Sequence, residues 1–317
     1  YKEAIACYER ALDMTKRIQD STRVAICYQS LGDVHMSSDS IPKAIECYIN
    51  ALHIAEETDN QRGVATACTY LCNAYSFAGN DIEAVKWGRR AIELGEQLHD
   101  DRRIAFACIM SSKAYGKLGE FDEMGTLIQR AIHLCEKTGD FHGMAWAKNM
   151  RAMFHFWHQD YESALEELNY MIQMGKESGG FQHEVTQALA HFAEIHLRLG
   201  RYREAFEYCQ QSLEISLRLS NMVTYGHAYR VLAEIHTSEE YRDWEKASWY
   251  LEESLKAYRE VGSQANLGLA YLIGARIALQ RKDGTARQWA ETARNIFSEL
   301  GAKLYLQDAE EFLESLE

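Results

Sequence analysis

Two pairs of side chains lie one helical turn apart in this sequence and have the chemistry of metal ligands. Cys68 and Cys72 offer thiolates, and His155 and His158 offer imidazoles. A structural zinc site needs about four ligands, and neither pair has a second pair at zinc-site spacing. Side-chain packing therefore explains both pairs better, and we expect no metal and no cofactor.

Other histidines follow a regular pattern that also argues against catalysis. The same repeat position is filled by His35, His155, His196 and His236, and by Tyr75 and Tyr115. A position shared by His and Tyr suits an amphipathic ring that packs in a core and hydrogen-bonds through its polar edge. The sequence also lacks HExxH, GxSxG, glycine-rich phosphate-loop and EF-hand motifs. We therefore predict a non-enzymatic protein with no catalytic residue.

The composition is that of an ordered helical protein. The 317 residues are 47% hydrophobic and 26% charged, include one proline, and carry a formal net charge of −13. Nucleic-acid binders place Lys and Arg on the contacting face, so the acidic balance predicts no nucleic-acid partner.

Membrane and export signals are also missing from the sequence. The longest apolar stretch, Leu267 to Leu279, is too short to span a bilayer and contains Arg276, so it is interpreted as a core helix. No charged-then-apolar leader opens the sequence. The eight cysteines lie in helical apolar patterns without a CxxC pair, which favours reduced thiols. We expect a cytoplasmic protein with no membrane partner.

The elements that carry these side chains repeat about every forty residues. Mostly small residues mark one register: Ala4, Ala44, Ala84, Met124, Ala164, Ala205, Ala247 and Ala286. A second set follows seven residues behind: Ala11, Ala51, Ala91, Ala131, Met171, Ser212, Ser254 and Ala293. Small side chains at a constant register let each helix pack closely on its neighbours, which predicts an all-α solenoid.

One unit shows how the repeat folds. The apolar spacing predicts a first helix from Val24 to Met36 and a second from about Ile41 to Glu56. Ser40 is the expected N-cap, and Pro42 lies in the first turn, where its missing N–H costs nothing. Helix-ending glycines are expected at 79, 119 and 200, and turns between hairpins at 59, 100, 139–140, 179–180, 220–221 and 262.

These residues resemble the tetratricopeptide repeat family. The first-helix pattern of that family is matched by Tyr28, Leu31, Gly32 and His35, and the second-helix pattern by Ala44, Tyr48 and Ala51. The period of about forty departs from the usual value of about thirty-four, and the closing proline is absent. The longer period resembles kinesin-light-chain and spindle-orientation adaptors and the C-terminal tails of bacterial multidomain regulators.

The resemblance implies a right-handed superhelical solenoid of antiparallel hairpins. We expect a single domain over 1–317, with an orphan second helix of a truncated repeat at 1–18, seven helical hairpins over 21–301 and a capping helix at 302–317. The capping helix is expected from an apolar stripe of Ala309, Phe312, Leu313 and Leu316 beside a charged one.

In that family the first helices line a concave groove, which implies a partner-binding site. The predicted groove residues are Tyr70, Asn73, Phe77, Phe106, Met110, Lys113, Lys117, Trp146, Asn149, Met150, Met153, Trp157, His191 and Arg230. The same face includes Gln29, Asp33, Gln187, Glu194, Arg198, His227 and Glu234. Clustered aromatic and methionine side chains favour an interaction surface. The alternative is packing, through a one-residue register slip at the fourth hairpin or through tight curvature.

Two functional hypotheses follow. The first is a protein–protein interaction scaffold of a larger signalling or regulatory protein, which binds a peptide or a partner-domain helix in the groove. The partner is a separate protein or a domain of the same parent chain, and self-association is a further alternative. The second hypothesis is a sensor tail that binds a small effector and controls an attached ATPase, cyclase, protease or transcription-factor domain.

Overall fold

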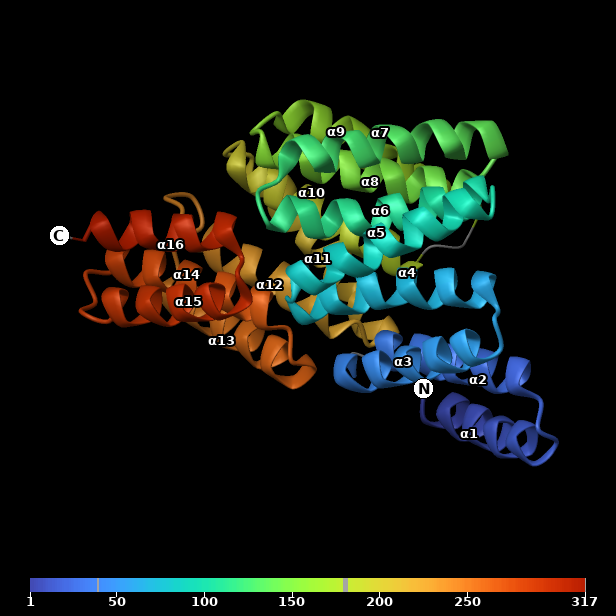
Figure 1. Cartoon of the computed structure of the whole chain (residues 1–317). Helices are drawn as coiled ribbons and strands as arrows, with labels where there is room; N and C mark the ends of the chain where they lie inside the picture. Colours follow the sequence, from blue (N-terminus) through green and yellow to red (C-terminus); the bar gives the residue numbers. More distant parts are fainter. Residues whose placement is uncertain (39, 179–181, 317) are drawn as a thin grey trace. The chain divides into compact units, whose positions relative to one another are not determined.

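The protein is described by a computed structural model that covers residues 1–38, 40–178 and 182–316. These residues form sixteen helices and no strand (Figure 1). The helices pack as consecutive hairpins, which confirms the predicted all-α solenoid class. Within the described residues, no helix is long and apolar enough to cross a membrane.

The chain divides into two compact units, one of residues 1–116 with 120–147 and the other of residues 148–317 with 117–119. The first unit contains α1 (Lys2–Arg17), α2 (Ser21–Ser37), α3 (Ile41–Glu57), α4 (Gln61–Ala78), α5 (Asp81–Gln97), most of α6 (Asp101–Lys117) and α7 (Phe121–Thr138). The boundary falls inside α8 (Phe141–Trp157). The single domain over 1–317 stays a prediction.

The second unit continues the same hairpin order. Its helices are the end of α8, α9 (Tyr161–Ser178), α10 (Gln182–Arg198), α11 (Tyr202–Leu219), α12 (Met222–Ile235), α13 (Trp244–Val261), α14 (Gln264–Gln280), α15 (Ala286–Leu300) and α16 (Lys303–Glu314). We call α2, α4, α6, α8, α10, α12 and α14 the first helices, because each opens a hairpin.

The helix ends follow the local sequence. Gly79, Gly119 and Gly200 have φ of 85°, 77° and 72°, the left-handed conformation predicted for helix-ending glycines. Ser40 occupies the N-cap position of α3, but its side chain accepts no cap hydrogen bond, whereas the Asn60 side chain caps α4 by accepting from Gly63 N. The predicted turn at 179–180 lies outside the described residues.

The repeat markers form the contacts between helices. Ala44, Ala84, Met124, Ala164, Ala205 and Ala247 are fully buried, and Ala286 is nearly so. The second set of markers, seven residues behind the first, is also buried at each position from Ala51 to Ala293. The sequence prediction of close helix packing at this register is therefore confirmed.

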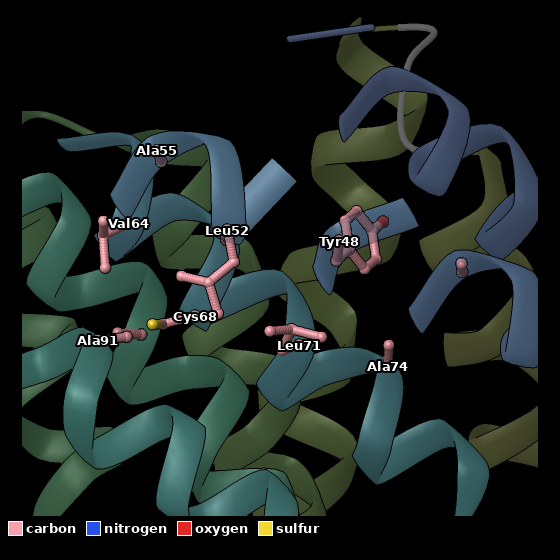
Figure 2. Packing of buried hydrophobic residues seen from close by; sticks show 11 residues of the cluster. Tyr48, Leu52, Ala55, Val64, Cys68, Leu71, Ala74 and Ala91 are labelled. Atoms are coloured by element: carbon pink, nitrogen blue, oxygen red, sulfur yellow. The ribbon is translucent and has the colours of Figure 1, made fainter. Parts of the chain in front are cut away.

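Figure 2 shows this packing for α3, α4 and α5. Leu52, Cys68 and Leu71 gather between the helices, with Ala91 of α5 beside the Cys68 sulfur. Tyr48 is also buried, and its ring fills the space that a Cβ on Gly32 would occupy, 2.4 Å from Cε1. Glycine at position 32 is therefore required by close approach of α2 and α3.

Candidate functional site

One face of the first helices carries side chains that vary from repeat to repeat. It consists of the sixth, tenth and thirteenth residues of each first helix, which share a face because three- and four-residue spacings match one helical turn. We call it the first-helix face. The thirteenth residues are Asp33, Asn73, Lys113, Met153, Glu194, Glu234 and Arg276.

Most of the predicted groove residues are partly accessible. Half-buried side chains belong to Tyr70, Asn73, Phe77, Phe106, Met110, Lys113, Lys117, Trp146, Met150, Met153, Trp157 and His191. Asn149 and Arg230, each 5% exposed, are buried. The assignment of all fourteen residues to a binding site stays a prediction.

In the first unit, three of these residues form an aromatic ladder across successive first helices. The rings of Tyr70 and Phe106 lie 6.0 Å apart at 70°, and those of Phe106 and Trp146 lie 5.4 Å apart at 35°. Tyr48 extends the ladder, because its ring stacks on Tyr70 at 5.2 Å. Such offset and edge contacts stabilise the rings while their half-exposed faces stay available to a ligand.

Polar side chains border the ladder. The Lys113 ammonium lies 3.6 Å from the centre of the Phe77 ring, a cation–π contact within the first unit. On α8, the buried Trp146 Nε1 and Asn149 Oδ1 have no hydrogen-bond partner among the described residues.

The first-helix face of the second unit has a different chemistry. Three of its residues, Glu194, His227 and Glu234, pair with Arg198 and Arg230 of the same two helices, and we call these five residues the charge network of α10 and α12. Arg230 Nη2 donates to Glu194 Oε2 at 2.9 Å, and Arg198 Nη1 donates to Glu234 Oε2 at 2.8 Å. His227 Nε2 lies 2.6 Å from Glu194 Oε2. The two glutamates therefore have cationic or imidazole partners on both helices.

Electrostatics keeps Glu194 ionised although this carboxylate is buried. Burial opposes ionisation of Glu194, but the charges of Arg230 and His227 outweigh burial and hold the pKa of Glu194 well below its ordinary range. His191, the other histidine here, places its ring 5.2 Å from that of His227. Of the predicted groove residues, Arg230 therefore bonds to Glu194, and His191 contacts His227, another partner of Glu194.

The fourth hairpin contains charged residues that the sequence interpretation did not pair. Arg151 is the eleventh residue of its first helix, where α2 and α4 have Leu31 and Leu71. Its Nη2 donates to Glu167 Oε1 at 2.6 Å, and Lys148 Nζ lies 3.2 Å from Glu167 Oε2. An arginine at a position that other first helices fill with leucine is the sequence feature that could have indicated this pairing.

Cys68 and Cys72 are poorly suited to nucleophilic chemistry. All eight cysteines are free, and burial raises the pKa of Cys68 to about 11 and that of Cys72 to about 12. Cys72 Sγ contacts Ser111 Oγ at 3.8 Å, so this thiol packs between α4 and α6. Among the described residues, no group of three His, Cys, Asp or Glu side chains is placed to hold a metal ion.

Successive hairpins with a constant packing register and a variable first-helix face define a helical repeat scaffold. Residues 184–260 match the family model of the tetratricopeptide repeat. The match is confined to these residues, and together with the fold it supports the resemblance carried by the residue pattern around Gly32 and Tyr48. Among curated proteins, none matches this sequence.

Three solved structures illustrate the similarity. A Rap protein complexed with competence and sporulation factor is 14% identical, with a TM-score of 0.74 over 91% of this chain and 80% of that chain. The Rap conjugation gene regulator of plasmid pLS20, in complex with the Phr* peptide, is 12% identical, with a TM-score of 0.72 over 88% and 75%.

The third structure is a signal transduction ATPase with numerous domains, with a tetratricopeptide repeat sensor, from Pyrococcus horikoshii. It is 15% identical, with a TM-score of 0.59 over 98% of this chain and 50% of that chain. At these identities the three similarities show the fold.

Proposed function

We propose that this chain is a non-enzymatic scaffold that binds a peptide, or a helix of a partner domain, on its first-helix face. The observation that carries the proposal is the aromatic ladder of Tyr70, Phe106 and Trp146, whose rings are half-buried rather than enclosed in the core. Aromatic and methionine side chains supply large contact area at protein interfaces.

The two Rap structures support this proposal, because one was solved with competence and sporulation factor and the other with the Phr* peptide. The chain then acts in the cytoplasm as the repeat region of a larger signalling or regulatory protein. Its partner is a separate protein or a domain of the same parent chain. The unpaired cysteines support a reducing compartment.

A peptide-display selection on the whole chain tests the proposal. Enriched peptides are resynthesised, and their affinity is measured for the wild type and for Trp146→Ala combined with Met150→Ala. We expect the double variant to lose at least about tenfold in affinity, because interface aromatics dominate binding energy.

The matched control replaces two large apolar residues of the second helices, Ile49→Ala with Ile82→Ala, which are 45% and 53% exposed. This control should bind like the wild type. Equal affinity of the wild type and the Trp146 and Met150 variant, with unchanged circular dichroism, would contradict the site assignment.

A second candidate function is a sensor that binds a small effector. It is favoured by the similarity to the Pyrococcus horikoshii protein with a repeat sensor, of which this chain spans about half. A thermal-shift screen of the chain against metabolites distinguishes the two, because a ligand that binds the native state raises the melting temperature. Stabilisation by a metabolite without peptide binding would favour the sensor.

A further inference from the structure

Asp33 is a carboxylate on the first-helix face without a cationic partner. It is the thirteenth residue of α2 and is half-buried. Tyr48 Oη donates to Asp33 Oδ1 at 2.7 Å, and no Lys or Arg among the described residues forms an ion pair with it. A carboxylate has room for about four hydrogen bonds, so most of its accepting capacity is unused. Burial raises the pKa of Asp33, and the Tyr48 hydrogen bond opposes this only in part.

Tyrosine rings of α3 and α4 lie beside this carboxylate, and a ring of α6 continues the row. Tyr48 of α3 stacks on Tyr70 of α4 with an interplanar angle of 17°, and Phe106 of α6 meets Tyr70 edge-on. Burial, followed by the charge of Asp33, raises the pKa of both tyrosines, as expected if the carboxylate lies close to them.

The charge network of the second unit shows what a satisfied acid on this face looks like. Glu194 and Asp33 occupy the same thirteenth position of their helices. Glu194 has Arg230 and His227 within 2.9 Å, whereas Asp33 has a phenol. A half-buried carboxylate beside the partly exposed Tyr70 ring fits a group that is positively charged and can lie flat on a ring.

We propose that Asp33, Tyr48 and Tyr70 form a subsite for a cationic side chain, a guanidinium or ammonium group, of the bound peptide. The proposal rests on the peptide-binding function above and specifies its ligand. The cation pairs with the free oxygen of Asp33 and covers the exposed part of the Tyr70 ring. Arginine fits best, because its planar group donates in pairs to a carboxylate and stacks on aromatic rings.

The test uses two small probes that differ in charge and little in shape. Nα-acetyl-arginine amide and Nα-acetyl-citrulline amide are titrated into the full chain, and binding is followed by saturation-transfer NMR. We expect the wild type to bind the arginine probe about tenfold more tightly than the citrulline probe. Glycinamide, which carries only a terminal ammonium, shows whether a peptide amino terminus can replace the side chain.

Two variants and a control make the result specific. Asp33→Asn keeps an oxygen that accepts from Tyr48 but removes the charge, so it should abolish the preference for arginine. Tyr70→Leu removes the ring and should reduce the preference with Asp33 intact. Glu46→Gln, an exposed acid on α3, is the control and should behave like the wild type. Equal binding of both probes to the wild type, or a preference that survives Asp33→Asn, would overturn the proposal.

The outcomes separate this subsite from the general peptide function. If displayed peptides depend on Trp146 and Met150 but lose nothing when arginine is replaced by citrulline, the peptide site stands and the cation subsite is wrong. If no peptide is enriched but the arginine probe binds through Asp33, the subsite stands and the peptide function is wrong.

Discussion

Replacing Arg230 with methionine should destabilise the second unit far more than a typical surface substitution. The Arg230 side chain is 6% exposed and bonds to Glu194 at 2.9 Å and Glu234 at 3.4 Å. Methionine has a similar length but no charge, so both glutamates lose a buried partner. Breaking a buried ion pair from one side costs about 3–5 kcal/mol, because the remaining charge stays desolvated.

The matched double variant isolates the electrostatic part of this cost. Arg230→Met combined with Glu194→Met removes one charge of each sign and leaves Arg198 paired with Glu234 at 2.8 Å. Replacing a buried pair with apolar residues of similar size is often neutral. We therefore expect the double variant to recover at least about 2 kcal/mol of the loss in the single variant.

Hydrogen exchange of the α10 and α12 amides is the suitable assay, because repeat arrays open locally and a global transition can hide a local change. The single variants Arg230→Met and Glu194→Met are measured alongside the double variant. If their losses in opening free energy simply add up in the double variant, Arg230 and Glu194 do not act as a pair and the reasoning is refuted.

The pH dependence gives an independent check with a defined sign. The folded-state pKa of Glu194 lies below the unfolded value, so its contribution to stability is present above about pH 4.5. That contribution is lost as the pH falls from the unfolded pKa through the lowered folded pKa. The Arg230→Met variant should lose less stability over this acid range than the wild type does.

Three further outcomes are expected. Gly226→Ala should cost about 1–3 kcal/mol in urea unfolding, because its Cβ would lie 2.8 Å from the Tyr258 ring, whereas Gly284→Ala has no atom within 4 Å and should be tolerated. Asp33→Asn should stabilise the chain at pH 7. Because the folded-state pKa of Asp33 is raised, the stability advantage of Asp33→Asn should fade as the pH falls towards the unfolded-state pKa of the aspartate. A difference in unfolding free energy that stays constant with pH would contradict the raised pKa. Cys7, the exposed thiol, should react with a thiol reagent in the native state while the buried thiols react only on unfolding, as a colorimetric titration will show.

The fold was predictable because its information is local and repeated. The alanine register around Ala44 and Ala51 fixes which side of each helix packs, and burial of these residues follows from helical geometry alone. The second helix predicted from about Ile41 to Glu56 extends one residue further, to Glu57. Helix ends at Gly79 and Gly200 were predictable for the same reason, since a left-handed residue is a local requirement.

The pairing of charges was not predictable from local patterns. Arg230 and Glu194 are separated by 36 residues, and which of several nearby acids an arginine selects depends on how neighbouring helices are rotated. The sequence placed both on the same face without indicating that they bind each other. Arg151 takes the position of Leu31 and Leu71, but its partner Glu167 lies on the following helix and is marked by no sequence motif.

The thirteenth position of the first helices has a consequence for how such a protein can evolve. Its seven occupants are an aspartate, an asparagine, a lysine, a methionine, two glutamates and an arginine. The alanine register that builds the fold lies on other positions, so a substitution at a thirteenth residue outside the charge network, such as Asn73 or Met153, leaves that packing register in place. Natural variation can therefore rewrite ligand preference one repeat at a time, and duplicated genes can diverge in specificity without passing through an unfolded intermediate sequence.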